Sequence, residues 1–446
     1  MSEAGPVELA RPVRLAFAAA LLIDLSIAGW LVWRTSILEA FSDMFDWMER
    51  WYALQADGDL GRYLWAPHNF HHLVWTFAVL ALDVRVFGAS GYLFLAVGVL
   101  CLMVTAAMLA GLGAAAAGRG LKLVGGGGAA ALSAMGCHAL DASADINTTY
   151  VHALMFAVAA ILLAEAPGRQ ARWRPLAALA CAAAAGLGSA AGLAVWPALL
   201  FRAWRTGRRG WAAAVLASGA AFSLCYLLGQ APPGSAGSAS ATAVVTMIVN
   251  DLGLPWARGL GGAGWLVGLV VLVAALTALH FKGGAGAAWP ERAAASLIVF
   301  SLTTASLAGV ARAGVIAPGL PPMRYAIFMI PLHVGLWVLA LPYLRRAWTW
   351  RPRLMERAVV AAAVLMVAHQ AVTAVYAVRT ADAALGEIAD FRAGQRKPAM
   401  FIAIYPDLAK AQALSRRMRR DGFYQRELRA DPAPSGSGTW VSRTDR

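Results

Sequence analysis

The chain has 446 residues, of which 60% are hydrophobic and only 14% are charged, and its formal net charge is +14. Soluble domains contain about 45–50% apolar and about 25% charged residues, so this composition excludes an ordinary soluble domain and a disordered chain. Several apolar windows exceed about 18 residues, the length that crosses the hydrocarbon core of a bilayer. The sequence therefore predicts an all-α polytopic membrane protein.

Hydropathy predicts about eleven transmembrane helices. They are 14–34, 91–113, 124–140, 149–165, 175–189, 190–203, 211–229, 262–281, 292–310, 323–344 and 357–376. The first is too long for the apolar part of a cleaved signal peptide, so we interpret it as an uncleaved anchor. The segment 230–261 is assigned to a loop.

Two of these spans, 175–189 and 190–203, are short and are joined by the glycine-rich segment 186–192. Small residues let helix backbones approach closely in lipid. We therefore predict a tight hairpin that stops short of the far face and leaves a water-accessible cavity. A single kinked helix is the alternative.

The segment 66–86 is apolar but begins with three histidines and carries Asp83 and Arg85. Counting it as a span would put the basic stretch 168–174 outside, against the bias of Lys and Arg toward cytoplasmic loops. We therefore predict an interfacial helix at 66–86, within an outside loop that covers 35–90. This orientation leaves the N-terminus in the cytoplasm and the C-terminus outside.

Residues 1–376 then form the transmembrane domain, and residues 377–446 form a small non-cytoplasmic tail. The tail is expected to be α/β, because Met400–Tyr405 suits a short strand and Asp407 can cap a helix that runs to about Arg420. Its end, from about residue 431, is rich in Pro, Gly and Ser and is predicted to be disordered. The basic run 416–420 is interpreted as a solvated helix face near anionic headgroups or phosphates.

The first outside loop is acidic, although the chain as a whole is strongly basic. It sets six acids against Arg50 and Arg62, and the acids are Glu39, Asp43, Asp46, Glu49, Asp57 and Asp59. Partial desolvation among the aromatic neighbours of Asp43 and Asp46 would raise a carboxylate pKa and make it a better general base. The alternative is an acidic loop that is merely excluded from the cytoplasm.

A histidine-rich element follows, with His68, Asn69, His71 and His72 in close succession. If a helix begins by Pro67, His68 and His72 are four residues apart on one face and can contact one partner. That partner is a phosphate or the headgroup region, and a metal site is the weaker interpretation because spacing places no third ligand.

Other polar candidates lie at predicted outside edges. Asp145 and Asn147 belong to the second outside loop, and Arg324 and Tyr325 begin a late span. A guanidinium at that depth can bind a lipid phosphate with two hydrogen bonds, and simple snorkelling to the interface is the alternative. Inside the membrane, Asp24 is a candidate for a proton relay or for a structural hydrogen bond.

Taken in order, these features resemble the GT-C superfamily of integral-membrane glycosyltransferases, and within it a bacterial group of uncharacterised proteins. The residues that carry the resemblance are Phe45-Asp46-Trp47, His68-Asn69-Phe70-His71-His72, Asp145-Ile146-Asn147, Arg324-Tyr325 and Tyr405-Pro406-Asp407. Phe70 and His72 stand where that group has Glu and Arg, so the roles of those two residues do not carry over.

The resemblance implies a multi-pass protein of the bacterial cytoplasmic (inner) membrane that moves a sugar, with inversion, from a polyprenyl-phosphate carrier to a cell-envelope acceptor on the non-cytoplasmic face. The acceptor is a polysaccharide, a lipid or a protein. Asp46, or Asp43, is the expected base, and Arg324 with His68 or His72 is expected to hold the carrier phosphate. The remaining candidates for binding substrate or carrier are Asn69, His71, Asp145, Asn147 and Tyr325. No cofactor is implied, although a divalent metal would suit a diphosphate carrier, and no nucleic-acid partner is expected.

Two other classes share much of this pattern. A transporter or flippase of a lipid-linked or small polar substrate would need inverted repeats and charges at the midplane, and only Asp24 favours it. A structural subunit or polymerase of envelope polysaccharide shares the topology.

Overall fold

The computed structural model describes residues 8–69, 71–136, 147–166, 173–228, 239–257, 264–282, 286–314, 323–395 and 404–424. Within these ranges every regular element is a helix, and the sole β-type pairing is an isolated bridge between His68 and His71. The predicted all-α class is confirmed. The α/β tail is not confirmed, because Ile404 and Tyr405 form no strand and most of Met400–Tyr405 lies outside the described residues. The predicted disordered end from residue 431 also lies outside them.

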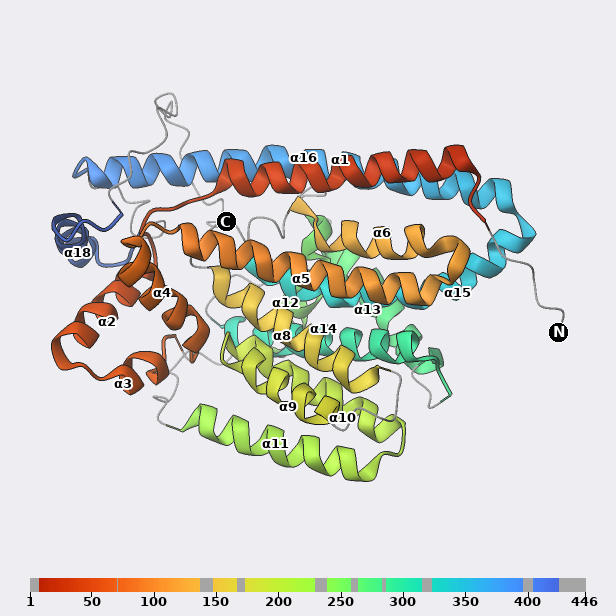
Figure 1. The fold of residues 1–446 in the computed structure, drawn as a ribbon, viewed down its shortest axis with the longest axis horizontal. Helices are drawn as coiled ribbons and strands as arrows, with labels where there is room; N and C mark the ends of the chain where they lie inside the picture. The colour runs from red at the N-terminus through yellow and green to blue at the C-terminus, as the bar shows by residue number, and fades with distance from the viewer. Residues whose placement is uncertain are drawn as a thin grey trace.

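Figure 1 shows how the helices of the described residues are arranged. They are α1 (Arg11–Thr35), α2 (Met44–Asp57), α3 (Leu60–Trp65), α4 (Val74–Phe87), α5 (Tyr92–Ala117), η1 (Arg119–Leu121), α6 (Lys122–Ser133), α8 (Thr148–Glu165), α9 (Trp173–Gly186), η3 (Ala190–Ala194), α10 (Val195–Arg205), α11 (Arg209–Leu227), α12 (Ala241–Ala257), α13 (Gly264–Lys282), α14 (Trp289–Arg312), η5 (Met323–Met329), α15 (Ile330–Trp350), α16 (Pro352–Arg392) and α18 (Leu408–Arg420).

Eight stretches among the described residues are long and apolar enough to cross a bilayer. They are Arg11–Thr35, Tyr92–Ala117, Thr148–Glu165, Arg209–Leu227, Gly264–Phe281, Trp289–Arg312, Met323–Trp350 and Pro352–Arg392. The predicted count of eleven is not confirmed, because α6, α9 and α10 have 12, 14 and 11 residues, whereas a crossing needs roughly 17–25. Eight such helices still indicate a multi-pass membrane protein in a lipid bilayer.

The predicted loop 230–261 contains a helix that the sequence interpretation missed. Helix α12 has 17 residues and includes Pro255, and its polar Asp251 is fully buried. It packs closely against α13, because a Cβ added at Gly268 would lie only 1.8 Å from the carbonyl oxygen of Val249. Hydropathy missed α12 because it is short and polar residues interrupt it.

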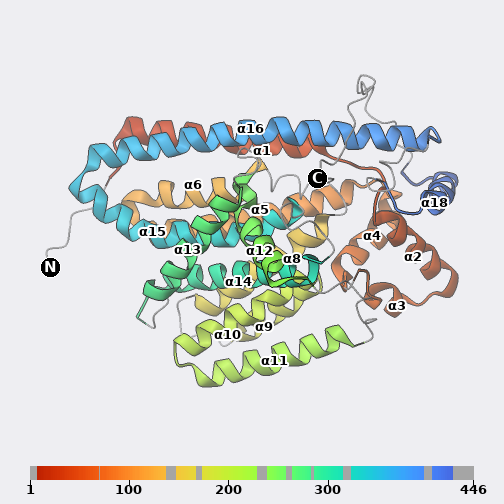
Figure 2. The ribbon, with the colours of Figure 1, turned by 180° about the vertical axis from the view of Figure 1, so that it is seen from behind.

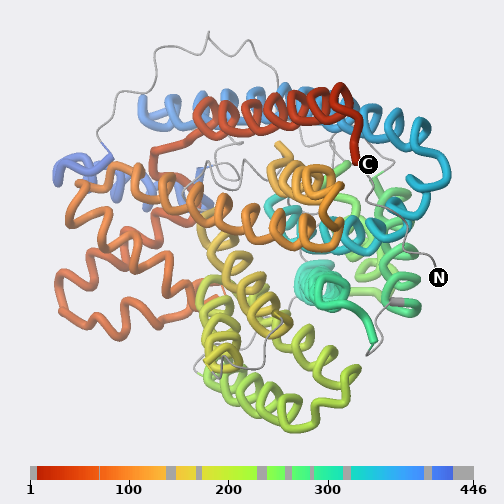
Figure 3. The backbone as a smooth tube through the Cα atoms, turned by 45° about the vertical axis from the view of Figure 1, so that its right-hand side comes forward, coloured from red at the N-terminus to blue at the C-terminus, as the bar shows by residue number. Residues whose placement is uncertain are grey.

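The long helices form one elongated bundle. Helices α1 and α16 run side by side along one edge, and α11 lies at the opposite edge in both views (Figures 1 and 2). The main hydrophobic core lies between α5, α8, α14 and α15 and includes Leu109, Val158, Phe300 and Val334. The short helices α2, α3 and α4 cluster at one end of the bundle beside α18 (Figure 3).

This end has a hydrophobic core of its own. Trp47 and Phe77 belong to it, and so do Phe391 near the end of α16 and Met418 of α18. Helix α16 therefore continues past the predicted boundary at residue 377 without a break and reaches Arg392. It carries the tail to the end of the bundle that holds α2, α3 and α4.

The glycine-rich segment forms the predicted hairpin. The chain turns back after α9, so that a Cβ added at Gly192 would lie 2.1 Å from the carbonyl oxygen of Ala185. At the tip, the backbone N–H of Ala190 donates to Nδ1 of His71 at 3.1 Å. The hairpin tip therefore contacts the first outside loop, and the alternative of one kinked helix is wrong.

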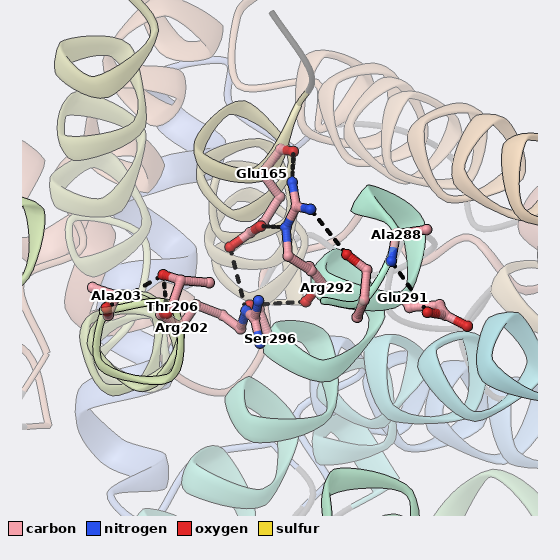
Figure 4. A network of polar contacts seen from close by, with 9 residues as sticks. Glu165, Arg202, Ala203, Thr206, Ala288, Glu291, Arg292 and Ser296 are labelled. Carbon is pink, nitrogen blue, oxygen red and sulfur yellow. Dashed lines mark hydrogen bonds and ion pairs between the residues drawn. The ribbon is translucent and has the colours of Figure 1, made fainter. Parts of the chain in front are cut away.

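A buried ionic cluster joins three helices at the opposite end of the bundle (Figure 4). Glu165 of α8 pairs with Arg292 of α14, with Nε 2.8 Å from Oε2, and lies 3.6 Å from Nε of Arg202 in α10. Glu165 and Arg202 are 6% and 2% exposed. Charges buried this deeply persist only when they are paired, so the cluster fixes the ends of these helices to one another.

Candidate functional site

The end of the bundle that carries α2–α4 contains a polar cavity of about 170 Å³. The first outside loop contributes Ser42, Asp43, Trp47, His68, Asn69, His71 and Leu73 to its lining. The helical bundle contributes Asn147, Thr149, Tyr150, Ser189, Arg312 and Arg324. Six of the residues singled out in the sequence thus meet in one cavity at the tip of the α9–α10 hairpin. These are Asp43, His68, Asn69, His71, Asn147 and Arg324.

A tight backbone turn sets the direction of the His68 and His71 side chains. The backbones of His68 and His71 exchange two hydrogen bonds of 2.8 Å, and Asn69 between them adopts a positive φ of 47°, a conformation that Asn tolerates better than most residues. Arg50 secures the approach to this turn by donating to the carbonyl oxygens of Ala66 and of Pro67, the latter at 2.9 Å.

The helix expected from Pro67 onward was wrong, because α4 begins only at Val74. It is His71, not His72, that shares the cavity with His68. His72 is 1% exposed and lies behind the turn. Its ring stacks on Trp65 at 4.5 Å and its Nε2 lies 2.9 Å from the carbonyl oxygen of Tyr226. His72 therefore anchors α11 to the loop.

Asp43 is held by its neighbours. Nε2 of His68 lies 3.3 Å from Oδ2 of Asp43, and the side-chain amide of Asn69 donates to the same oxygen at 3.3 Å. Burial raises the pKa of Asp43, but the hydrogen bond and charge of His68, the charge of Arg324 and the Asn69 amide outweigh it and lower the pKa below its usual 3.8. The expected rise in this pKa is therefore wrong, and Asp43 is an ionised proton acceptor at neutral pH.

His71, in contrast to the ionised Asp43, is a neutral side chain. Burial, together with the charge of Arg312, lowers its pKa from 6.5 to about 4, so the ring is neutral near pH 7. Its Nδ1 accepts the N–H of Ala190. The proton of the neutral ring is therefore on Nε2, and His71 can donate a hydrogen bond to a ligand.

Two arginines line the cavity. Arg324 at the start of η5 was expected from the sequence, whereas Arg312 was missed because it follows the end of the predicted span at residue 310. The sequence feature that could have identified Arg312 is its position as a lone cation in the last turn of an apolar helix. Neither arginine forms an ion pair with a carboxylate in the part of the chain that the structure describes. With a single carboxylate in the lining, the cavity favours an anion.

Asp46, the first choice for the base, does not line this cavity. Its Oδ1 accepts hydrogen bonds from the hydroxyl of Tyr405 and, at 3.0 Å, from Nζ of Lys410. Lys410 also contacts Glu49 at 2.8 Å, and this hydrogen bond raises the Lys410 pKa. Asp46 therefore fastens the tail to the loop, beside an open hollow of about 380 Å³ that also reaches His68.

The side chains of Asp43, Asp46 and His68 offer ligand atoms within 4.8 Å of one another. Two carboxylates and an imidazole could hold a divalent cation, although the ammonium of Lys410 on Asp46 would compete with it.

The remaining predicted site residues either lie near the cavity or fall outside the described residues. The guanidinium of Arg324 lies 5.9 Å from the ring centre of Tyr325, whose ring lies 6.5 Å from that of Tyr150 in the cavity wall. Tyr325 thus supports the wall from behind. Asp145 and Phe70 lie outside the described residues.

Comparisons of the chain with protein-family models, with curated proteins and with solved structures find no match. The GT-C resemblance therefore stays a prediction that rests on the sequence motifs.

Proposed function

We propose that the protein is a membrane glycosyltransferase that moves a sugar from a polyprenyl-phosphate carrier to a cell-envelope acceptor, with inversion at the anomeric carbon. One observation carries the proposal: an ionised carboxylate and two arginines without carboxylate partners among the described residues line the same polar cavity of about 170 Å³. Sugar transfer from a phosphate needs both a proton acceptor and a site that stabilises the departing phosphate.

In this mechanism the acceptor hydroxyl attacks the anomeric carbon while the bond from that carbon to the phosphate oxygen breaks. The bonding electrons leave with the polyprenyl phosphate, and the hydroxyl proton passes to Asp43. Attack and departure on opposite faces of the sugar invert the anomeric carbon. The low pKa of Asp43 keeps it deprotonated before each turnover.

Arg312 and Arg324 bind the phosphate and offset the charge that develops as it leaves. A guanidinium suits this role because it can donate two parallel hydrogen bonds to phosphate oxygens. The N–H on Nε2 of His71 supplies a neutral donor beside them. His68 and Asn69 act through Asp43, whose carboxylate they orient.

The proposed setting is the bacterial cytoplasmic membrane, with the cavity on the periplasmic face and the N-terminus in the cytoplasm. The distribution of basic residues supports it, because the end of the bundle opposite the cavity carries Arg205, Arg209, Arg346 and Arg353. Lys and Arg concentrate in cytoplasmic loops of membrane proteins.

The test uses the full-length protein in nanodiscs and a panel of polyprenyl-phosphate sugars, with mass spectrometry to detect release of free polyprenyl phosphate. The wild type is expected to release the carrier from at least one donor, and Asp43→Asn is expected to lose that activity. Arg346→Gln, which removes a cation at the far end of α15, is the matched control. Carrier release that is equal in the wild type and in Asp43→Asn would contradict the proposal.

Transport of a lipid-linked or small polar substrate is the second candidate. It is favoured by Asp24 and Asp251, because in the described part of the chain neither oxygen of either buried carboxylate has a hydrogen-bond partner. Ionisable residues inside a membrane often mark the proton or ion pathways of carriers. Proteoliposome uptake that is abolished by Asp24→Asn or Asp251→Asn, but not by Asp43→Asn, would favour transport.

A further inference from the structure

A second cavity of about 170 Å³ lies inside the bundle, between α1, α6, α15 and α16. Its lining includes the apolar side chains of Phe17, Val124, Trp337, Val359 and Ala363. It shares no lining residue with the polar cavity at the end of the bundle. Asp24, near the middle of α1, is the one charged residue in its wall.

Among the described residues, the carboxyl group of Asp24 has no hydrogen-bond partner. The residue is 1% exposed, and neither Oδ1 nor Oδ2 has a hydrogen-bond donor among the described residues. A polar side chain close by has other partners: the amide of Gln370 accepts from the backbone of Gly136 and donates to the carbonyl oxygens of Asp24, at 3.4 Å, and of Ala134, at 2.8 Å. The wall of the cavity thus contains an acidic group with unmet hydrogen-bonding capacity.

Water alone is a poor occupant. A buried water typically needs about two to four polar partners, and this wall offers only the carboxyl group of Asp24. The rest of the surface favours an apolar molecule. A cavity of comparable size with apolar walls holds a benzene-sized ligand.

The occupant must therefore bring an apolar body and its own hydrogen-bond donor. We propose that this cavity binds a small lipophilic amine, with its ammonium group on the carboxylate of Asp24. An amine fits better than an alcohol, because a carboxylate inside the membrane keeps its charge only beside an opposite charge.

Such a ligand can enter from the bilayer. Ala362 lines the cavity and is itself exposed, and the surrounding surface of α1 and α16 is apolar, with Leu22 and Leu365 67% and 69% exposed. Lipophilic amines partition into this layer. The proposal does not depend on glycosyl transfer, so it can be tested separately.

The experiment measures the affinity of three probes of similar size for the full-length protein in nanodiscs. They are benzylamine, benzyl alcohol and toluene, each carrying a 4-fluoro label and followed directly by ¹⁹F NMR against empty nanodiscs. The wild type is expected to bind benzylamine at least ~10-fold more tightly than either neutral probe, a difference of about 1.4 kcal/mol. Asp24→Asn should remove that preference.

Two controls separate the site from general effects. Asp251→Asn removes another buried membrane carboxylate and should leave benzylamine binding unchanged. Ala363→Leu should block the cavity for all three probes while Asp24 stays in place, whereas Ala361→Leu on the exposed face should have no effect. Equal affinity for the amine and the neutral probes in the wild type, or unchanged binding in Ala363→Leu, overturns the proposal.

Discussion

Nε2 of His68 lies 3.3 Å from Oδ2 of Asp43, although the two residues are separated in the chain by the helices α2 and α3. The amide of Asn69 binds the same oxygen. Both contacts fall on Oδ2, which leaves Oδ1 to meet an acceptor hydroxyl. His68 and Asn69 thus orient the carboxylate of Asp43 and keep it ionised.

Asp43→Asn is expected to lower the rate of sugar transfer by about 10²–10⁴-fold, the usual contribution of a general base. Asp46→Asn is expected to lower the rate of sugar transfer by less than about 10-fold, because Asp46 contacts the tail and does not line the cavity. Single-turnover rates in nanodiscs check both. Full loss of transfer in Asp46→Asn with an active Asp43→Asn would reverse the assignment.

Arg312→Gln and Arg324→Gln should each raise the KM for the carrier by about 10–100-fold, because each removes a charge-assisted contact to phosphate. Lysine at either position should restore part of the affinity, since it keeps the charge but not the two parallel hydrogen bonds. Initial rates against carrier concentration give the KM, with Arg346→Gln as the control. An unchanged KM in both Gln variants would remove the phosphate role.

His71 makes stability depend on pH. Its pKa in the folded protein is about 4, below its ordinary 6.5, so the unfolded chain binds more protons between these values. The stabilisation is complete above pH 6.5 and is lost as the pH falls toward 4. His71→Asn should therefore reduce the loss of unfolding free energy between pH 7 and pH 4.5 by about 1–3 kcal/mol.

Thermal unfolding in detergent across this pH range measures the effect. The exposed His280 offers a control, since His280→Asn should leave the pH dependence of the wild type in place. An equal pH dependence in the wild type and in His71→Asn would mean that His71 is not buried as a neutral ring.

Glu165→Gln should destabilise the protein by about 3–5 kcal/mol, because it leaves the buried guanidinium of Arg202 without its counter-charge. Glu291→Gln, in the first turn of α14, changes a more exposed carboxylate and should cost about 1 kcal/mol or less. Thermal unfolding in detergent compares the two. Equal losses would show that the cluster at Glu165 adds nothing specific.

Lys410→Ala should loosen α18, because Lys410 joins the tail to Asp46 and Glu49 of α2. Exposed ion pairs contribute about 0.2–1 kcal/mol each, so amide exchange within 408–420 should rise several-fold while that of α1 stays constant. Arg416→Ala, an exposed residue of the same helix, is the control. Unchanged exchange in Lys410→Ala would show that the contacts between the α2 and α18 side chains are dispensable.

Local pattern predicted that Asp43, His68, Asn69 and Arg324 belong to one functional site, and the structure places all four in the lining of one cavity. Polar side chains at the edges of apolar spans are costly unless they meet one another or water, so their positions along the chain already indicated one shared end. Pattern favoured Asp46 over Asp43 as the base, whereas the cavity lining includes Asp43 and not Asp46. The two residues are three positions apart, but Asp46, unlike Asp43, is bound by Tyr405 and Lys410, which lie far along the chain.

The sequence by itself determined that this is a multi-pass membrane protein, because apolar windows of spanning length have few other stable environments. It did not determine which histidine shares the cavity with His68, because a backbone turn and not helix periodicity sets that direction. Only the tertiary structure placed Arg312 in the same cavity as Asp43 and left Asp24 in the wall of an apolar cavity. Both outcomes depend on how distant helices pack, and helix packing is decided by side-chain shape across the whole bundle.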